Sequence, residues 1–368
     1  MKPRARMFLS TMAMFAILCG CSKSPDSDKA GKTPTPTTQS AAGKSINVYL
    51  YSEYIDPDIP KQFEEKTGIK ANLSFYEATE DMMAKLQQAG GAEQYDVVVV
   101  SDHAIPVLAK QGLIRELDLS RVPNAKNLDP RFANPSYDPG NRHSLPYQWG
   151  TMGLVYRTDK IKDIDASWGL IFDAARQPGP FVMVDSMRDM FAAALKYQGK
   201  SINVRNADEI RGAGELILQA KKSPKLLGFE GSPGAVSKVS SDEAVLGIVY
   251  NGDALKAVKE DQNVGFAVPK EGTLIWVDAM TVPSKAPNAE GAYKFIDYIL
   301  DAEVGAQLSN FNSYATPNAA SMPKITPEDR ENPMIYPPHD QVKKMEYLED
   351  VGNDTRLYDE VWTAVKSR

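Results

Sequence analysis

Residues 46–76 read INVYLYSEYIDPDIPKQFEEKTGIKANLSFY, and this stretch decides the fold class. Its two ends, at 46–51 and 69–76, are short apolar runs that are typical of β-strands. Between them, residues 60–66 predict a helix that begins with a proline and ends at Gly68. Because a strand, a helix and a second strand in succession are the unit of a parallel sheet, the stretch predicts an α/β fold.

The same alternation continues along the chain and predicts two α/β series. The expected strands lie at 95–100 and 181–186, within 245–253 and 266–272, and at 274–280. The expected helices lie at 80–90, 104–112, 188–200 and 207–222, and a long amphipathic segment at 289–311 is expected to be helical, with room for a break. In doubly wound sheets ligands sit beyond the carboxyl ends of strands, and two such series give two lobes with a cleft between them.

Composition and missing motifs exclude several classes of function. A chain of 368 residues with 42% apolar composition can form about two domains. Its net charge of −6 disfavours nucleic-acid binding. Three histidines without an HExxH motif or a Cys/His cluster speak against zinc, so no metal is expected. The phosphate-binding motifs GxGxxG and GxxxxGKS/T are also missing, so no cofactor is expected. An enzyme with paired carboxylates stays open, because acidic residues are plentiful.

The N-terminus has the features of an exported lipoprotein. A basic start is followed by an apolar run at 7–18 that is too short to span a bilayer and typical of a signal peptide. The sequence Leu18-Cys19-Gly20-Cys21 resembles a bacterial lipobox, so residues 1–20 are expected to be removed and Cys21 lipidated; an ordinary signal peptide is the alternative. Residues 21–44 contain no large apolar side chain after Cys21 and predict a flexible tether. With both cysteines in this region, the folded part has no disulfide.

A carboxylate lies within the apolar strand LIWVDAM, residues 274–280. Burying an unpaired carboxylate costs several kcal/mol, so Asp278 is expected to meet a cation. A Lys or Arg of the protein is the structural alternative. Trp276 lies two residues away and therefore on the same face of the strand.

Other stretches also combine aromatic rings and acids at strand ends. Tyr51, Ser52, Glu53 and Tyr54 follow the first strand, Tyr250 precedes a tight Asn251-Gly252 turn and Asp253, and Asp189 lies in a strand-to-helix turn. Structural explanations stay open: a helix N-cap for Asp253, the helix dipole for Asp189, and core packing for Tyr51, Tyr250 and Trp276. As a set, carboxylates and aromatic faces suit the ammonium groups and methylene chains of a linear polyamine.

The chain resembles the periplasmic polyamine-binding proteins of bacterial ABC importers, the spermidine/putrescine receptor family. The markers extend over about 46–366 and include YSEYI, FEEKTGIK, YDVVVVS, LPYQWGTMGLVY, YNGD, PKEGTLIWVDAMTVP and SYATPNAA. The resemblance implies a two-lobed, Venus-flytrap fold of the periplasmic-binding-protein type, each lobe a mostly parallel sheet flanked by helices. We expect lobe 1 to comprise 45–149 plus 278–320, and lobe 2 to comprise 150–277 plus 321–368. It also implies a monomer without catalytic activity that delivers polyamine to a membrane permease.

Matching positions imply twelve ligand-binding residues: Tyr51, Ser52, Glu53, Tyr54, Ser101, His103, Asp189, Tyr250, Asp253, Trp276, Asp278 and Tyr314. The chain departs from the family pattern where Tyr51 and Tyr250 replace tryptophan, where Asp189 replaces a glutamate, and at the extra acid Asp102.

The length of the amine is the open point. Asp253 resembles putrescine-preferring relatives and Trp276 resembles spermidine-preferring ones. We expect putrescine, because a second carboxylate near Asp278 suits a short diamine with both ends charged. A receptor for another small ligand, such as an amino acid, a sugar or ferric iron, and a polyamine sensor without a transport role stay open as alternatives. The expected location is the periplasm or cell surface, with a lipid anchor in a bacterial membrane.

Overall fold

The computed structural model describes residues 44–52, 54–77 and 79–367. The predicted signal peptide, the lipobox with Cys21 and the tether up to residue 43 lie outside the described residues, and so does Glu53. Within the part that is described, no helix has both the length and the apolar character needed to cross a membrane.

The first half of the folded part is a parallel sheet in the order β2-β1-β3. Its strands are β1 (Ser45–Tyr51), β2 (Lys70–Tyr76) and β3 (Val97–Ser101), and its connecting helices are α1 (Ile59–Thr67), α2 (Thr79–Gln87) and α3 (Ile105–Lys110). Helix α1 ends at Gly68, whose left-handed backbone (φ 70°) terminates the helix as predicted. Phe63 of α1 packs against Phe295, with ring centroids 5.2 Å apart, in the core of this half.

The second half is also parallel and has the order β7-β5-β6. Its strands are β5 (Phe181–Val184), β6 (Leu226–Glu230) and β7 (Leu246–Tyr250), and its main helices are α5 (Met187–Tyr197), α6 (Ala207–Lys221), α7 (Ser232–Ser240), α8 (Asn251–Glu260) and α13 (Thr355–Ser367). Phe191 of α5 meets Tyr358 of α13 with ring centroids 4.9 Å apart, which ties the C-terminal helix into this core.

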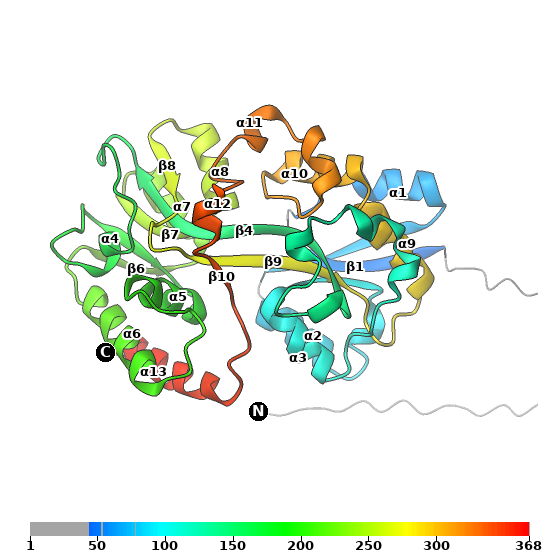
Figure 1. Ribbon diagram of the computed structural model, residues 1–368, viewed down its shortest axis with the longest axis horizontal. Coiled ribbons are helices and arrows are strands. Elements are labelled where there is room, and N and C mark those ends of the chain that lie inside the picture. The colour runs from blue at the N-terminus through cyan, green and yellow to red at the C-terminus, as the bar shows by residue number, and fades with distance from the viewer. Residues whose placement is uncertain (1–43, 53, 78, 368) are drawn as a thin grey trace, which may run out of the picture. The chain divides into compact units, whose positions relative to one another are not determined.

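Two antiparallel strands connect the halves. They are β4 (Ser144–Arg157) and β9 (Leu274–Thr281), and they cross the middle of Figure 1 between the groups of helices. Strand β9 also pairs with β3, and β4 also pairs with β7, so the eight strands follow the order β2-β1-β3-β9-β4-β7-β5-β6. The sequence predicted β9 as a strand. For β4 only a hinge strand near Tyr147–Thr151 was expected, and Pro146 and Gly153 weaken the strand pattern over the rest.

The remaining elements lie outside these two parallel sheets. They are α4 (Gly169–Phe172), β8 (Val264–Ala267), α9 (Ala289–Ile299), α10 (Ala302–Asn312), α11 (Pro327–Arg330), α12 (His339–Val342) and β10 (Glu346–Tyr347). The helical segment expected at 289–311 is indeed divided. The break falls before Asp301, whose side chain accepts a 2.9 Å hydrogen bond from the backbone N–H of Glu303 and so caps α10.

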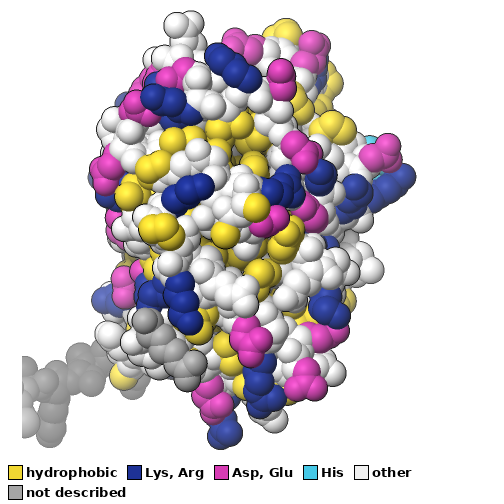
Figure 2. All heavy atoms as spheres, turned by 90° about the vertical axis from the view of Figure 1, so that its left-hand side faces the viewer, with side chains coloured by type: hydrophobic (Ala, Val, Ile, Leu, Met, Phe, Trp, Pro, Cys, Tyr) yellow, Lys and Arg dark blue, Asp and Glu magenta, His cyan; other side chains and the backbone are white. Residues whose placement is uncertain are grey.

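Figure 2 shows the face of the molecule at the left of Figure 1. Acidic and basic side chains are interspersed on this face, with apolar side chains between them. A nucleic-acid-binding surface concentrates lysine and arginine on one face, and this face does not have that distribution.

Candidate functional site

Asp278 lies in the middle of the fold, where β9 is hydrogen-bonded to β3 on one side and to β4 on the other. Its Oδ2 accepts a 2.8 Å hydrogen bond from the hydroxyl of Tyr54, and its Oδ1 accepts one of 2.8 Å from Ser101. The residue is 7% exposed, and no lysine or arginine in the described ranges forms an ion pair with it. The structural alternative of a protein cation therefore finds no support among the described side chains.

Burial sets the protonation of this group. It raises the pKa of Asp278 to about 6, and the nearby charge of Asp102 acts in the same direction. The hydrogen bonds from Tyr54 and Ser101 and the neighbouring His103 act against this rise. Near neutral pH the carboxylate is ionised in a poorly solvated place, which is an unfavourable state that an external cation would relieve.

A chain of hydroxyl groups leads to Asp278. Ser101 donates its single proton to the carboxylate, so the hydroxyl of Tyr51, 2.9 Å away, has to donate to Ser101. Tyr51 must then accept from Thr79, at 2.7 Å. Every donor in this chain is directed toward the carboxylate, which stabilises its charged form without supplying a positive charge. Thr79 was not among the predicted site residues.

A second carboxylate, Asp189, lies in the first turn of α5 and is 4% exposed. The hydroxyl of Tyr250, at the end of β7, donates a 2.5 Å hydrogen bond to its Oδ2. Burial raises the pKa of Asp189, although this hydrogen bond and the charge of Arg188 partly oppose the rise. The position at a helix N-terminus, offered as a structural explanation, is real, but the side chain also faces a site residue.

Asp253 is a third carboxylate, which is only partly buried, and burial raises its pKa as well. The prediction of a tight turn at Asn251-Gly252 is wrong, because both residues are helical and are the first two residues of α8. Tyr250 is the N-cap of this helix, so Asp253 is not the N-cap either; it stands three residues further on, inside the first turn. Asn251 explains the difference, since its buried amide is fixed by the N–H of Thr151 and the carbonyl of Met334.

Four aromatic rings form a continuous wall beside these carboxylates, which we call the aromatic wall: Tyr54, Tyr314, Trp276 and Tyr250. The ring centroids of Tyr54 and Tyr314 are 5.5 Å apart, those of Tyr314 and Trp276 are 5.2 Å apart, and those of Trp276 and Tyr250 are 6.3 Å apart, all in edge-to-face arrangements. Such rings offer apolar area to methylene groups and attract ammonium groups at their faces.

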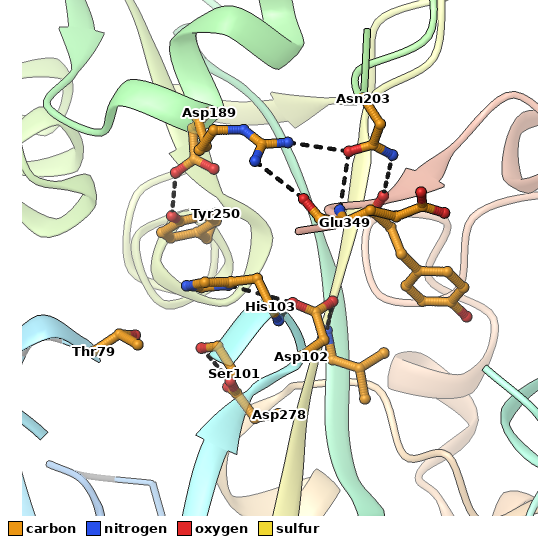
Figure 3. Close-up of polar contacts among 12 residues, drawn as sticks. Thr79, Ser101, Asp102, His103, Asp189, Asn203, Tyr250, Asp278 and Glu349 are labelled. Atoms are coloured by element: carbon orange, nitrogen blue, oxygen red, sulfur yellow. Dashed lines mark hydrogen bonds and ion pairs between the residues drawn. The ribbon is translucent and has the colours of Figure 1, made fainter. Parts of the chain in front are cut away.

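His103 and Asp102 form the remaining corner. Asp102 is 1% exposed and accepts hydrogen bonds from the N–H groups of His103 (2.7 Å) and Val277 (3.2 Å). The His103 ring lies 3.5 Å from the Asp102 carboxylate. Figure 3 shows this ring between two groups, Asp189 with Tyr250 on one side and Ser101 with Asp278 on the other. The sequence analysis noted Asp102 only as an extra acid. Its position directly after a strand was the signal that could have placed it in the site.

Ser52 does not join the other predicted residues, because its hydroxyl donates to the carboxylate of Glu77 instead. Glu53 lies outside the described residues. The structure thus brings together Tyr51, Tyr54, Ser101, His103, Asp189, Tyr250, Asp253, Trp276, Asp278 and Tyr314.

Next to Asp189 lies a hydrogen-bonded network that the sequence analysis did not predict. We call it the clasp, and it consists of Arg188, Asn203, Tyr347 and Glu349. Asn203 accepts hydrogen bonds from the guanidinium of Arg188 (3.1 Å) and the N–H of Glu349 (2.9 Å), and donates one to the carbonyl of Tyr347 (2.8 Å). Arg188 also donates to the carbonyl of Glu349, at 3.1 Å. Figure 3 shows this network beside the site. It holds the segment around β10 next to the first turn of α5.

The arrangement of these side chains suits the binding of a cation. In the described part of the chain no three His, Cys, Asp or Glu side chains gather as metal ligands would. The buried acids are instead distributed along a row of rings, which fits an elongated organic cation better than a compact ion.

The chain is also similar in sequence and in fold to known proteins. The family model described as bacterial extracellular solute-binding protein matches residues 59–334. The chain is 32% identical to the spermidine/putrescine-binding periplasmic protein 1 of Haemophilus influenzae, covering 92% of this chain and 94% of that relative. It is 33% identical to the putrescine-binding periplasmic protein SpuD of Pseudomonas aeruginosa, covering 89% of this chain and 94% of that protein. The solved spermidine/putrescine ABC transporter substrate-binding protein PotD from Streptococcus pneumoniae superimposes with a TM-score of 0.80 at 26% identity, covering 88% of this chain and 99% of that one.

Proposed function

The chain belongs to the bacterial extracellular solute-binding proteins, and on that premise we propose that it captures a polyamine and delivers it to the permease of an ABC importer. It is a solute-binding protein of transport and not an enzyme. Its fold is the two-lobed fold of periplasmic binding proteins, as the resemblance implied.

One observation carries the proposal. Asp278 is a buried carboxylate whose pKa burial raises to about 6, and its side-chain partners in the described structure are the hydroxyls of Tyr54 and Ser101 rather than a cation. A primary ammonium group would supply the missing charge and three N–H donors. In the arrangement described here the carboxylate lies away from water, so the ammonium group compensates a charge that would otherwise be buried without a cationic partner.

The rest of the site suits the remainder of a linear diamine. Methylene groups lie against the rings of Trp276 and Tyr314, and the second ammonium group meets the carboxylate of Asp189 or Asp253. Asp278 contacts Tyr54 and Asp189 contacts Tyr250 at opposite ends of the row of rings, which suits a diamine with both ends charged, and we propose putrescine as the preferred ligand. The relatives named above are described as binding putrescine or both putrescine and spermidine.

The proposal includes the organisation of the whole chain. Lobe 1 comprises 45–149 plus 278–320 and lobe 2 comprises 150–277 plus 321–368, and the two close on the ligand by bending along β4 and β9. The strand pairing up to Thr281 supports this division. Strand β9 pairs with β3 of the first half over Asp278–Thr281, and β4 pairs with β7 of the second half from Met152 onward. Lipidation of Cys21 would hold the protein, as a monomer, at a bacterial membrane beside its permease, in the periplasm or on the cell surface.

Calorimetry with putrescine, cadaverine and spermidine tests the ligand. We expect saturable binding, with putrescine preferred; spermidine binding at least tenfold tighter, about 1.4 kcal/mol, would contradict the preference. If no polyamine binds, the proposed function is contradicted, and a receptor for an amino acid or a sugar becomes the favoured alternative.

Asp278→Asn tests the site itself. We expect a loss of affinity of at least ~30-fold, because removing one partner of a buried charge pair costs ~2–5 kcal/mol. Asp138→Asn is the matched control, since Asp138 is also a buried aspartate (3% exposed) but binds the backbone and hydroxyl of Ser144. Equal affinity of Asp278→Asn and the unmodified protein would remove Asp278 from the site.

A further inference from the structure

Gly252 stands directly beneath a ring of the aromatic wall. A Cβ atom built on Gly252 would lie 1.9 Å from Cε1 and 2.0 Å from Cζ of Tyr314, well inside any real carbon–carbon contact. Gly252 lies in the first turn of α8 and its φ is not positive, so the backbone does not require glycine there. Glycine is a poor helix former, and the position therefore has a different reason to lack a side chain.

Gly150 has the same relation to a second ring. It lies directly opposite Trp276 in the β4–β9 pairing. A Cβ atom on Gly150 would lie 2.3 Å from Cζ2 of Trp276 and 2.4 Å from Oδ1 of Asn251. Glycine inside a strand often marks a close approach of another group, and here that group is the indole.

A displacement of the Tyr314 ring would not stay local. Tyr314 is in edge-to-face contact with both Tyr54 and Trp276, so a displacement of Tyr314 would disturb two more members of the aromatic wall. Tyr54 in turn donates its hydroxyl to Asp278. The two glycines are thus connected through the rings to the carboxylate at the centre of the site.

We propose that Gly252 and Gly150 are positioning residues for ligand capture: by lacking a side chain they set the places of the Tyr314 and Trp276 rings against which the ligand lies. This inference rests on the proposed function for its ligand, but not for its geometry. With the proposed lobe boundaries, Tyr314 and Gly252 belong to different lobes, so the absence of a Cβ at Gly252 also allows the lobes to come together.

The first test is Gly252→Ala with Gly212→Ala as a matched control. Gly212 is also a helical glycine, in α6, and a Cβ built there has only Gln198 Nε2 near it, at 3.9 Å. Alanine should favour the helix at both positions. We expect Gly212→Ala to keep the polyamine affinity measured by calorimetry and Gly252→Ala to lower it at least ~10-fold, a change of about 1.4 kcal/mol.

A double-mutant cycle separates positioning from a general structural effect. In a Tyr314→Ala background the space beneath the ring is free, so adding Gly252→Ala should cause no further loss of affinity. If Gly252→Ala alone does not fold, the double variant should fold again. An equal loss in both backgrounds, failure of both variants to fold, or unchanged affinity of Gly252→Ala would each overturn the inference.

The second test needs no ligand. The indole ¹H–¹⁵N signal of Trp276, assigned by its disappearance in Trp276→Phe, should shift in Gly150→Ala and stay in place in Gly212→Ala. An unmoved signal in Gly150→Ala would overturn the role of Gly150 even if polyamine binds. If the unmodified protein binds no polyamine while the signal moves, the proposed function fails and the positioning of the ring stands.

Discussion

At the scale of single residues, the site depends on three carboxyl groups that burial makes harder to ionise. Burial raises the pKa of Asp278 to about 6 and also raises those of Asp189 and Asp253. A polyamine keeps its charge over the same range, because alkylammonium groups titrate near pH 10. The protein, not the ligand, therefore determines how capture depends on pH.

We expect polyamine affinity to fall as the pH drops through about 6. Protonation of Asp278 removes the charge that the ammonium group meets, so affinity should decrease by up to about tenfold per pH unit below that point. Calorimetry between pH 5 and pH 8 measures this, and Asp278→Asn should flatten the profile. His103 faces Asp102, Asp189 and Asp278 and is therefore the residue to replace beside Asp278.

His103→Gln tests whether the fall in affinity depends on Asp278 without this imidazole. A profile that keeps its fall near pH 6 in this variant assigns the fall to the carboxyl group. His339→Gln is the control, because His339 is an exposed residue of α12. Affinity that is independent of pH down to pH 5 would contradict the role of Asp278.

The same carboxylate should lower the stability of the ligand-free protein. Since the pKa of Asp278 is higher in the folded state than its ordinary value of 3.8, the folded protein binds more protons between these pH values, and stability falls as the pH rises from 3.8 to about 6. At pH 7 the cost is about 3 kcal/mol. We expect Asp278→Asn to raise the unfolding temperature at pH 7 without ligand, whereas Asp138→Asn should lower it, because its carboxylate accepts hydrogen bonds from Ser144. Destabilisation by Asp278→Asn would show that its ionised form is well compensated.

At the scale of elements, local signals predicted most of the α/β alternation, and the failures have local causes. Helix α1 and strand β9 were predicted because proline, glycine and apolar runs mark their ends, and α9–α10 was predicted from its amphipathic pattern. The first turn of α8 was missed because the dipeptide Asn-Gly favours a turn. In the structure the Asn251 amide is held by hydrogen bonds to Thr151 and Met334, and the residue is helical. Contacts between distant segments, such as Tyr51 with Thr79, have no local signal.

The clasp around Asn203 is an element-scale feature with a measurable role. Asn203→Ala removes hydrogen bonds to Tyr347, Glu349 and Arg188, and we expect it to lower the free energy of unfolding by ~1–3 kcal/mol. Urea unfolding measures the loss, and hydrogen exchange at the amide of Glu349 should accelerate. Asn72→Ala, on the exposed side of β2, should change neither. Unchanged exchange at Glu349 would mean that other contacts hold this segment.

At the scale of the whole molecule, the site is formed by segments far apart in the sequence. Tyr54 and Ser101 from the first half bind Asp278, while Asp189 and Tyr250 from the second half lie on the other side of His103. The residue types at these positions could be chosen from the sequence with the help of the family resemblance. Their distances could not, because the pairing of β9 with both β3 and β4 brings them together. Ser52, which stands beside Tyr51 in the sequence, faces Glu77 because the two residues directly follow the paired strands β1 and β2.

The burial of this central group predicts that the halves move apart and together. Asp278 and Asp189 are 7% and 4% exposed, so a polyamine can reach them only if the halves separate, and bound ligand should hold them in the arrangement described here. We expect small-angle X-ray scattering to give a smaller radius of gyration with saturating putrescine than without it. Asp278→Asn should show no such decrease at the same putrescine concentration, whereas Asp138→Asn should contract like the unmodified protein. Identical scattering with and without putrescine, at concentrations where calorimetry shows saturation, would mean that capture proceeds without closure of the halves.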